Sequence, residues 1–216
     1  NIKSFISDLE KLNINKEIIV VDNNSDDKTK DEINKTNAKY ILEQKQGYGY
    51  AIKTGLNNAT GNYLITCEPD GTFEAKDIYK LLLYLENFDC VFGTRTSKSL
   101  IHNDAKMGAF LRYGNIVVAK LLEYLFRGPT LTDVGCTFKA FSIEAYNKIK
   151  DDLEVNDSTF QPELMINMIK KKLSIVEIPL HYKSRIGYSK ITYNFISSLL
   201  LGIKMIALIF KLRIKN

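Results

Sequence analysis

Short apolar segments that end in acidic and turn-forming residues recur along the first half of the chain, and they alternate with helical patterns. The apolar segments are 17–22, 39–44 and 62–70, and between them lie a polar helical stretch at 28–36 and a glycine-opened one at 47–59. Strands that alternate with helices at this spacing favour an α/β fold with a mostly parallel central sheet and helices on both faces. Ligands of such sheets bind beyond the carboxyl ends of the strands, and the acidic residues lie there.

The rest of the chain continues the alternation with longer helices. Apolar periodicity predicts helices at 77–87, 107–126, 145–153 and 163–172, and strands at 89–95, 174–184 and the end of 132–142. Residues 1–12 resemble an amphipathic helix with no strand before it, so we expect the chain to start inside a domain. With 216 residues, we expect one domain over 1–192, followed by an apolar and basic helix over 193–216.

Composition narrows the choice of partners. The 30 Lys and Arg outnumber the 25 Asp and Glu, and much of the excess lies in the last third, which suggests phosphates, an anionic bilayer or simply a solvated basic face. The basic residues are not interleaved with aromatics along a groove-sized element, so nucleic acid is not an expected partner. Cys67, Cys90 and Cys136 are widely spaced, which supports neither disulfides nor zinc and favours a reducing, cytosolic setting.

The most informative motif is an acidic turn after the strand at 62–66. Glu68 and Asp70 flank Pro69, and Gly71 follows, so two carboxylates can reach one hard cation if the backbone turns there. An acidic turn that caps the helix near Asp77 would explain the same residues without a metal. We therefore predict a metal site at Glu68 and Asp70 and keep the capping role as the alternative.

A second polar group follows the first visible strand. Asp22, Asn23 and Asp27 could accept hydrogen bonds from a base or a ribose, which would give a nucleotide site its specificity. Acidic residues near the positive end of a helix are the alternative explanation.

A third group opens the helix at 47–59. Gly47 and Gly49 would let backbone N–H groups approach an anion, and Lys53 lies about one turn further on. The spacing matches neither the dinucleotide-binding nor the P-loop pattern.

The fourth group is the polar segment RIGYSK at 185–190. Arg185, Ser189 and Lys190 could close over a diphosphate and stabilise its charge as it leaves. A basic surface loop is the alternative.

Taken in order, these segments resemble the family 2 glycosyltransferases of the GT-A fold, in the branch of dolichyl-phosphate and polyprenyl-phosphate sugar synthases. The resemblance covers nearly the whole chain to about residue 192. It rests on the segments 17–29, 46–55, 67–78, 91–95, 107–115, 131–142 and 185–190. Two departures are visible: Glu68 stands where the family usually has Asp, and the family's opening strand is not found ahead of Asn1.

The resemblance implies inverting transfer of a sugar from a nucleotide-diphosphate sugar to a lipid phosphate, with Mg²⁺ or Mn²⁺ held by Asp70 and Glu68. It also implies that Pro69 belongs to the nucleotide-sugar site, that Asp133 faces the acceptor, and that Glu163 supports the site from behind. Side chains expected to hold phosphates are Arg95, Arg112, Lys139, Arg185, Ser189 and Lys190. A phosphate acceptor is already an anion and needs no general base, and His102 and His181 lie outside the motifs.

Three other functions remain as alternatives: a non-catalytic nucleotide-sugar-binding subunit, a family 2 transferase that acts on a glycan hydroxyl, and a sugar-phosphate nucleotidyltransferase. The last would need a glycine-rich, lysine-bearing signature that the visible N-terminus lacks. The stretch from Phe195 to Phe210 is short for a spanning helix and contains Lys204, so we expect it to lie on the cytoplasmic face of a membrane, or to pack on the domain or on a second copy.

Overall fold

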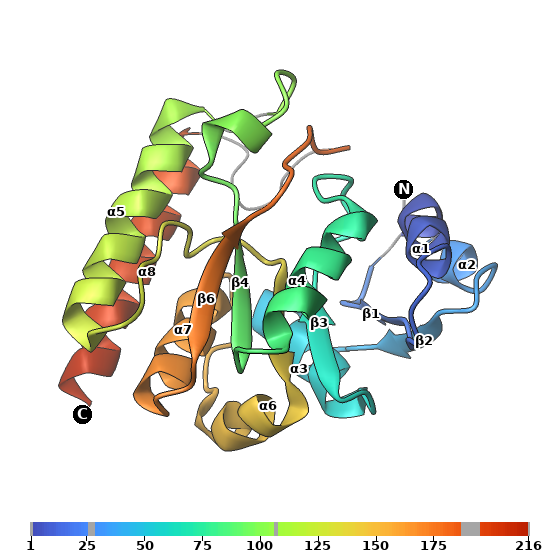
Figure 1. The fold of residues 1–216 in the computed structure, drawn as a ribbon, viewed down its shortest axis with the longest axis horizontal. Helices are drawn as coiled ribbons and strands as arrows, with labels where there is room; N and C mark the ends of the chain where they lie inside the picture. The colour runs from blue at the N-terminus through green and yellow to red at the C-terminus, as the bar shows by residue number, and fades with distance from the viewer. Residues whose placement is uncertain (1, 26–28, 106–107, 187–194, 216) are drawn as a thin grey trace.

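Two groups of strands carry the fold. The computed structural model describes residues 2–25, 29–105, 108–186 and 195–215 (Figure 1). β1 (Ile19–Asp22) and β2 (Lys39–Leu42) pair in parallel. The second group is one sheet with the strand order β3 (Tyr63–Thr66), β5 (Lys139–Ser142), β4 (Cys90–Thr94) and β6 (Ile175–Pro179). Within the described ranges no ladder joins the two groups.

The four-stranded sheet is mixed. β5 runs antiparallel to β3 and β4, and β4 pairs in parallel with β6, so β3, β4 and β6 share one direction. The predicted α/β class is confirmed, and the reversed β5 refines the expected mostly parallel sheet. Residues 139–141 of β5 are buried, as are all residues of the adjacent β4, so hydrophobicity alone could not reveal the direction of β5.

Helices cover both faces of this sheet, because alternate strand residues feed two separate cores. Cys90 and Phe92 of β4 belong to one hydrophobic cluster, and Val91 between them belongs to the other. The first cluster lies under α5 to α8 and the second under α1 and α4. The helices are α1 (Ile2–Glu10), α2 (Thr29–Ile33), α3 (Tyr48–Asn58), α4 (Ile78–Leu85), α5 (Ala109–Phe126), α6 (Ile143–Ile149), α7 (Phe160–Lys170) and α8 (Phe195–Ile214).

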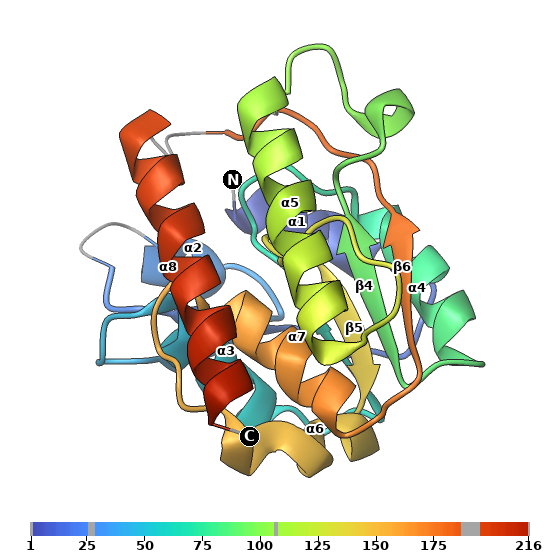
Figure 2. The same cartoon turned by 90° about the vertical axis from the view of Figure 1, so that its left-hand side faces the viewer.

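The last helix, α8, is part of the domain's packing. Met205, Ile209 and Leu212 are buried in the first hydrophobic cluster, and α8 lies against α5 and α7 (Figure 2). Phe195 at its start meets Phe110 at the start of α5, with ring centroids 4.3 Å apart. Its 20 residues are long and apolar enough to cross a membrane by length and composition alone. The helix is therefore longer than the apolar stretch that the sequence suggested.

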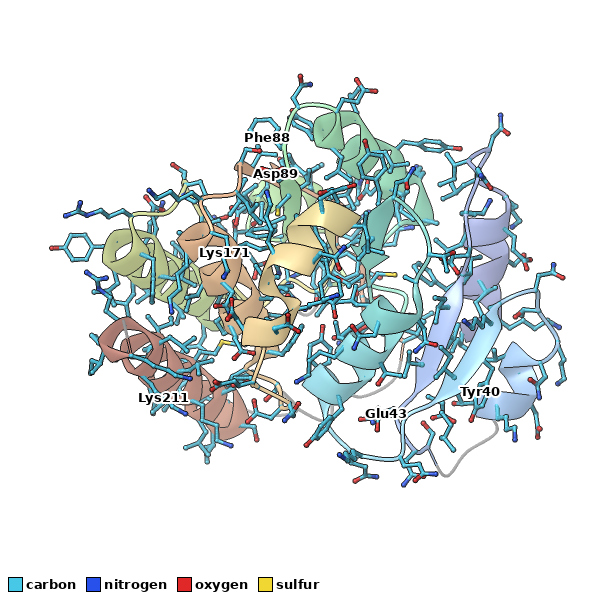
Figure 3. All side chains as sticks on the ribbon, turned by 90° about the horizontal axis from the view of Figure 1, so that it is seen from below. Tyr40, Glu43, Phe88, Asp89, Lys171 and Lys211 are labelled. Atoms are coloured by element: carbon cyan, nitrogen blue, oxygen red, sulfur yellow. The ribbon has the colours of Figure 1, made fainter. Side chains whose placement is uncertain are left out.

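The direction of the strands decides where the loops gather. Asp89, just before β4, accepts hydrogen bonds from the backbone N–H and hydroxyl of Ser174, just before β6, both at 2.7 Å. These contacts hold the starts of the two strands together. Asp89 is labelled in Figure 3, which shows the molecule from below. Because β3, β4 and β6 run the same way, the loops that follow them leave the sheet at the opposite edge. Those loops contain Glu68 to Asp70, Arg95 and Arg185.

Candidate active site

The acidic turn after β3 is built by Asp70 itself. Its Oδ1 accepts the backbone N–H of Thr72 at 3.0 Å and the Thr72 hydroxyl at 2.5 Å. Gly71 has φ +82°, a conformation that a side chain would disfavour, and a Cβ there would lie 2.9 Å from Ile186 Cδ1. The turn therefore needs glycine at residue 71, and it directs the second carboxylate oxygen of Asp70 away from Thr72.

Arg185 joins the two acids of this turn. Its Nη2 donates to Glu68 Oε2 at 2.9 Å and lies 2.6 Å from Asp70 Oδ2. Asp70 Oδ2 is buried, and among the described residues it has no partner with hydrogen-bond geometry. Burial and then the Asp70 charge raise the pKa of Glu68, and the Arg185 guanidinium opposes them. The structure thus brings together Glu68 and Asp70, predicted as metal ligands, and Arg185, predicted to meet a diphosphate.

The donor set of this turn suits a hard divalent cation. Two carboxylate oxygens converge on one point, and one of them is a buried oxygen without a hydrogen bond in the described part of the chain. Mg²⁺ is commonly held by one or two carboxylates, with water and substrate phosphates completing its shell. The described residues contain no group of three or more His, Cys, Asp or Glu side chains that could hold a metal. A cation at Glu68 and Asp70 would therefore be shared with a phosphate-bearing ligand.

A second charged group follows β4. Asp133 accepts from Arg95 Nε and Arg95 Nη2, each at 2.8 Å, and from the Arg95 backbone N–H at 3.0 Å. Burial works against the charge of Asp133, but the Arg95 guanidinium holds its pKa below the usual value. Tyr182 links this pair to the acidic turn. Its ring centroid lies 5.5 Å from the Arg95 guanidinium. Burial raises the pKa of its hydroxyl, and the charges of Arg95, Arg185 and Asp70 also act on that pKa.

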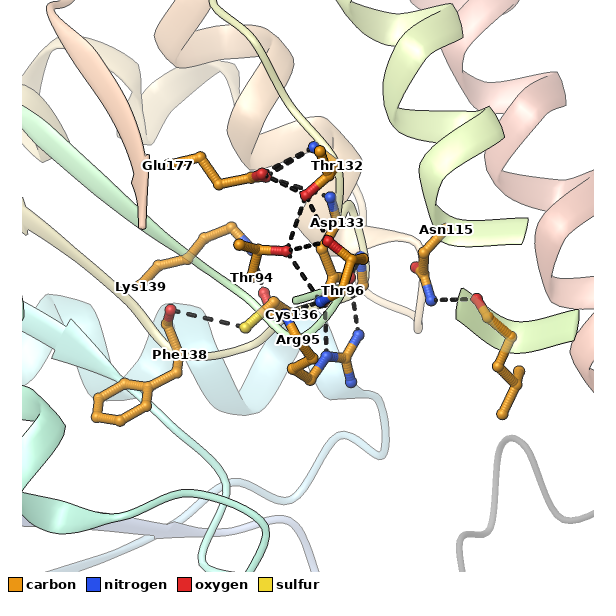
Figure 4. Close-up of polar contacts among 12 residues, drawn as sticks. Thr94, Arg95, Thr96, Asn115, Thr132, Asp133, Cys136, Phe138, Lys139 and Glu177 are labelled. Carbon is orange, nitrogen blue, oxygen red and sulfur yellow. Dashed lines mark hydrogen bonds and ion pairs between the residues drawn. The ribbon is translucent and has the colours of Figure 1, made fainter. Parts of the chain in front are cut away.

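Glu177 of β6 fixes the loop that carries Asp133. Its carboxylate accepts from the Thr132 backbone N–H at 2.8 Å, the Thr132 hydroxyl at 2.6 Å and the Asp133 backbone N–H at 3.2 Å (Figure 4). The Thr132 hydroxyl also lies within 2.9 Å of the hydroxyls of Thr94 and Thr96. Sequence reasoning missed Glu177, and the available signal was a lone acid inside the apolar segment SIVEIPL.

Two predicted site residues are placed differently from expectation. Lys139 is fully buried and donates its Nζ to the carbonyl of Cys136, so it holds the 132–136 loop from below and cannot face an acceptor phosphate. Asp133 is also fully buried, and both its oxygens are used by Arg95 and Gly135. In this structure Asp133 orients Arg95, which corrects its assignment as a group that acts on substrate.

The buried Lys139 gives a pH prediction. Burial lowers its pKa from 10.5 to about 8, so between these values the unfolded chain holds one proton more than the folded chain. The free energy of unfolding should therefore rise with pH across that window, by up to about 3 kcal/mol relative to a Lys139→Met variant. Urea unfolding of both proteins from pH 7 to 10.5 measures the difference. A pH-independent difference would contradict the assignment.

The glycine-rich start of α3 is packed against protein. Gly49 donates its N–H to the Asn156 carbonyl at 2.9 Å, and Gly47 donates to Asn23 Oδ1 at 2.8 Å. A Cβ at Gly47 would lie 2.4 Å from the Asn156 carbonyl oxygen, and Lys53 donates to the Asn156 side chain at 2.5 Å. These contacts correct the expectation of a free anion cradle: the glycines permit the 154–157 loop to approach, and Lys53 holds it.

The remaining predicted residues differ in where the structure places them. Asp22 is buried and accepts from Tyr40 at 3.0 Å and from the Ser25 N–H at 3.0 Å, so it shapes the loop after β1. Pro69 lies in the acidic turn. Arg112 of α5 lies over the Tyr113 ring, and its buried Nε has no hydrogen-bond partner in the described ranges. Asp27, Ser189 and Lys190 lie outside the described residues.

Helix α5 contributes to the same site through Asn115. A Cβ added at Gly135 would meet Asn115 Oδ1 at 2.9 Å and Arg95 Nη2 at 3.1 Å, so these polar groups converge above the loop that Glu177 fixes. Neighbouring Arg112 lies nearer the start of the same helix and brings a second guanidinium to this end of α5, with an Nε that has no hydrogen-bond partner among the described residues.

Comparison with known proteins assigns the chain to a family. The model of "Glycosyl transferase family 2" matches residues 1–150. The dolichyl-phosphate hexose transferase of Haloferax volcanii is 28% identical over 192 residues, which cover 88% of this chain and 80% of the relative. Glycosyltransferase AglJ of the same organism is 24% identical over 175 residues, covering 78% and 54%.

Solved structures agree with the fold. Glucosyl-3-phosphoglycerate synthase from Mycobacterium tuberculosis, in complex with Mn²⁺, UDP and glucosyl-3-phosphoglycerate, superposes with a TM-score of 0.74 at 16% identity, over 98% of this chain and 74% of that one. The likeness shows the GT-A fold. The chain belongs to glycosyl transferase family 2 and is a glycosyltransferase.

Proposed function

We propose that this glycosyltransferase moves a sugar from a nucleotide-diphosphate sugar to a lipid-phosphate acceptor of the polyprenyl or dolichyl type, with inversion and with a divalent cation. The observation that carries the proposal is the convergence of Glu68 Oε2 and Asp70 Oδ2 on one point, where Arg185 Nη2 lies. Two further facts support it: the Haloferax volcanii relative is named for dolichyl phosphate, and the mycobacterial structure contains Mn²⁺ with UDP.

In this proposal Glu68 and Asp70 hold the cation, which when bound neutralises charge on the departing nucleoside diphosphate. Glu68 is longer than the Asp usual at that position, yet its oxygen reaches the same Arg185 nitrogen as Asp70. Glutamate in place of aspartate therefore keeps a negative charge at the position proposed for the cation, which argues against a non-catalytic subunit. The segment after β1, with Asp22 and Asn23, forms the nucleoside side of the site.

The charges of the site favour a phosphate acceptor. Arg95 is held in place by Asp133, and Arg112 has a buried Nε that no described group uses, so both can meet an anion. Glu68 and Asp70 are paired with Arg185, and Asp133 is paired with Arg95. Because these three carboxylates are engaged by cations, none of them is free to deprotonate an acceptor hydroxyl. A phosphate oxygen attacks without that help.

The exposed face of α8 supports an acceptor at the membrane surface. At about 100° per residue, Ile196, Leu200 and Ile203 project directly away from the buried Met205 and Ile209. Exposed Phe110, Tyr113 and Val117 lie on the neighbouring helix α5. The two helices start at the same end of the molecule (Figure 2), where the rings of Phe110 and Phe195 are in contact. A solvent-facing apolar surface of this extent is typical of a membrane or protein contact.

Charge distinguishes a membrane from other partners of this face. Helix α8 contains no acidic residue, and its basic residues Lys204, Lys211 and Arg213 are exposed. Such cations would meet anionic head groups while the apolar residues enter the interface. We propose that α8 lies on the cytoplasmic face of a membrane, with the starts of α5 and α8 beside the acceptor.

The test is release of a nucleoside diphosphate from a panel of nucleotide sugars, with and without Mn²⁺ or Mg²⁺ and with a polyprenyl phosphate or an oligosaccharide. We expect turnover only when a divalent cation and the lipid phosphate are both present. Turnover with the oligosaccharide alone would favour transfer to a glycan hydroxyl. Binding of a nucleotide sugar without turnover under any condition would favour the non-catalytic alternative.

A further inference from the structure

We infer that Arg185 occupies the place of the divalent cation between Glu68 and Asp70 until the cation arrives, so that cation binding is an exchange against this guanidinium. The inference rests on the function proposed above. A single nitrogen of Arg185 lies 2.9 Å from Glu68 Oε2 and 2.6 Å from Asp70 Oδ2. That nitrogen stands where the two carboxylates would place a metal ion.

A metal ion and Arg185 would compete for the same oxygen of Asp70. Its Oδ1 is taken by the backbone N–H and the hydroxyl of Thr72, which leaves Oδ2 as the oxygen that a cation can approach. Arg185 Nη2 lies 2.6 Å from Oδ2 and forms an ion pair with it. Two cations cannot share the position, because like charges repel strongly at such distances. Two adjacent carboxylates that are largely out of solvent also need a counter-charge when no metal is bound, and Arg185 supplies it.

The backbone around Arg185 allows the exchange without loss of the turn. The Lys183 N–H donates to the Thr72 carbonyl at 2.9 Å, and the Ile186 N–H donates to the Asp70 carbonyl at 2.8 Å. These bonds, together with the contact of Ile186 on Gly71, hold the segment to the acidic turn from both sides of Arg185. The Arg185 side chain is one-third exposed, so it can rotate outward. Once displaced, the guanidinium is free to pair with a phosphate of the donor or acceptor.

The exchange predicts opposite effects of one substitution. Removing the charge with Arg185→Gln should tighten the binding of Mn²⁺ alone by about tenfold, because the resident cation no longer competes. The same variant should transfer sugar more slowly, because the released guanidinium no longer meets a phosphate. Loss of the free Mn²⁺ electron paramagnetic resonance signal on titration with the complete chain, without nucleotide, measures the affinity directly.

Two control variants separate the exchange from simpler effects. Lys183→Gln removes a cation two residues away that pairs with Glu74, and it should leave Mn²⁺ affinity almost unchanged. Arg185→Lys keeps the competing charge and should bind Mn²⁺ about as weakly as the wild type. The exchange is overturned if Arg185→Gln binds Mn²⁺ no more tightly than the wild type, or if Lys183→Gln or Arg185→Lys tightens binding equally. If no variant binds Mn²⁺ even with UDP or GDP present, the metal-dependent function proposed above fails together with the exchange.

Discussion

Replacing Asp70 by asparagine is expected to lower the rate of sugar transfer by about a thousandfold or more. A cation that stabilises charge on a departing phosphate contributes several kcal/mol to the transition state, and each 1.4 kcal/mol is about tenfold in rate. Asp70→Asn removes the charge at the buried oxygen that faces Arg185, while the hydrogen bonds from Thr72 can persist on the other oxygen. The turn should therefore keep its shape, and the free energy of unfolding should change by no more than about 1–2 kcal/mol.

The control for Asp70 is Glu74, which lies four residues further along the same segment. Its carboxylate pairs with Lys76 and Lys183, so Glu74→Gln removes an acid of the same loop without touching Arg185. Transfer by Glu74→Gln should remain close to wild type, and excess chelator should reproduce the loss seen with Asp70→Asn. Normal turnover by Asp70→Asn, or by the wild type in chelator, would exclude a metal role for the acidic turn.

The double variant Leu200→Glu, Ile203→Glu is expected to lose affinity for anionic vesicles by about a hundredfold or more. Both side chains are more than half exposed on the side of α8 that faces away from the domain. Burial of a leucine or isoleucine in an apolar medium contributes about 1.5–3 kcal/mol, and each 1.4 kcal/mol is tenfold in binding. Vesicle flotation with varied anionic lipid measures the partition. High salt should release the wild type only in part, because apolar burial is not screened.

A matched variant adds the same two charges elsewhere. Asn87 after α4 and Asn147 in α6 are exposed and belong to neither α5 nor α8, so Asn87→Glu, Asn147→Glu should float like the wild type. Sedimentation without lipid tests whether a second copy covers the face. If the wild type does not float with any vesicle but forms a dimer that the Leu200→Glu, Ile203→Glu variant loses, the face is a protein interface and the membrane proposal is wrong.

The order of helices and strands could be predicted because each element carries a local signal. Strand segments such as 17–22 and 89–95 are apolar and short, and α5 shows its periodicity over 18 residues. The reversal of β5 carries no such signal, because a strand buried on both faces has the same composition in either direction. Its direction is set by the pairing of distant segments.

Part of the candidate site could also be predicted. The sequence assigned Glu68, Asp70 and Arg185 to loops that follow strands, and the structure brings these three side chains together at one edge of the sheet; their roles toward a metal and a diphosphate stay predictions. Lys139 was misassigned because a lysine is normally exposed, and nothing in GCTFKAFS indicates that its ammonium would be buried under a loop. Glu177 was missed because its partners, two backbone N–H groups and one hydroxyl of residues 132 and 133, lie about 45 positions away in sequence.

The glycines of α3 show why one pattern can have two causes. Close approach of an anion and close approach of another loop both demand the absence of a Cβ. In this chain the neighbour is the carbonyl of Asn156, and it already accepts the Gly49 N–H. A single sequence contains the glycine but not the identity of what approaches it.

The shared packing of α8 has a consequence for anyone who wishes to obtain the enzyme without detergent. Met205, Ile209 and Leu212 belong to the hydrophobic cluster that also contains Cys90 and Phe92 of the central strand β4. Cutting the chain before α8 would expose that cluster to water, and even a single truncation of such a buried side chain to alanine typically costs about 2–5 kcal/mol. If the outer stripe binds a membrane as proposed, a water-soluble version is made by redesigning residues such as Ile196, Leu200 and Ile203, while the inner stripe is left intact.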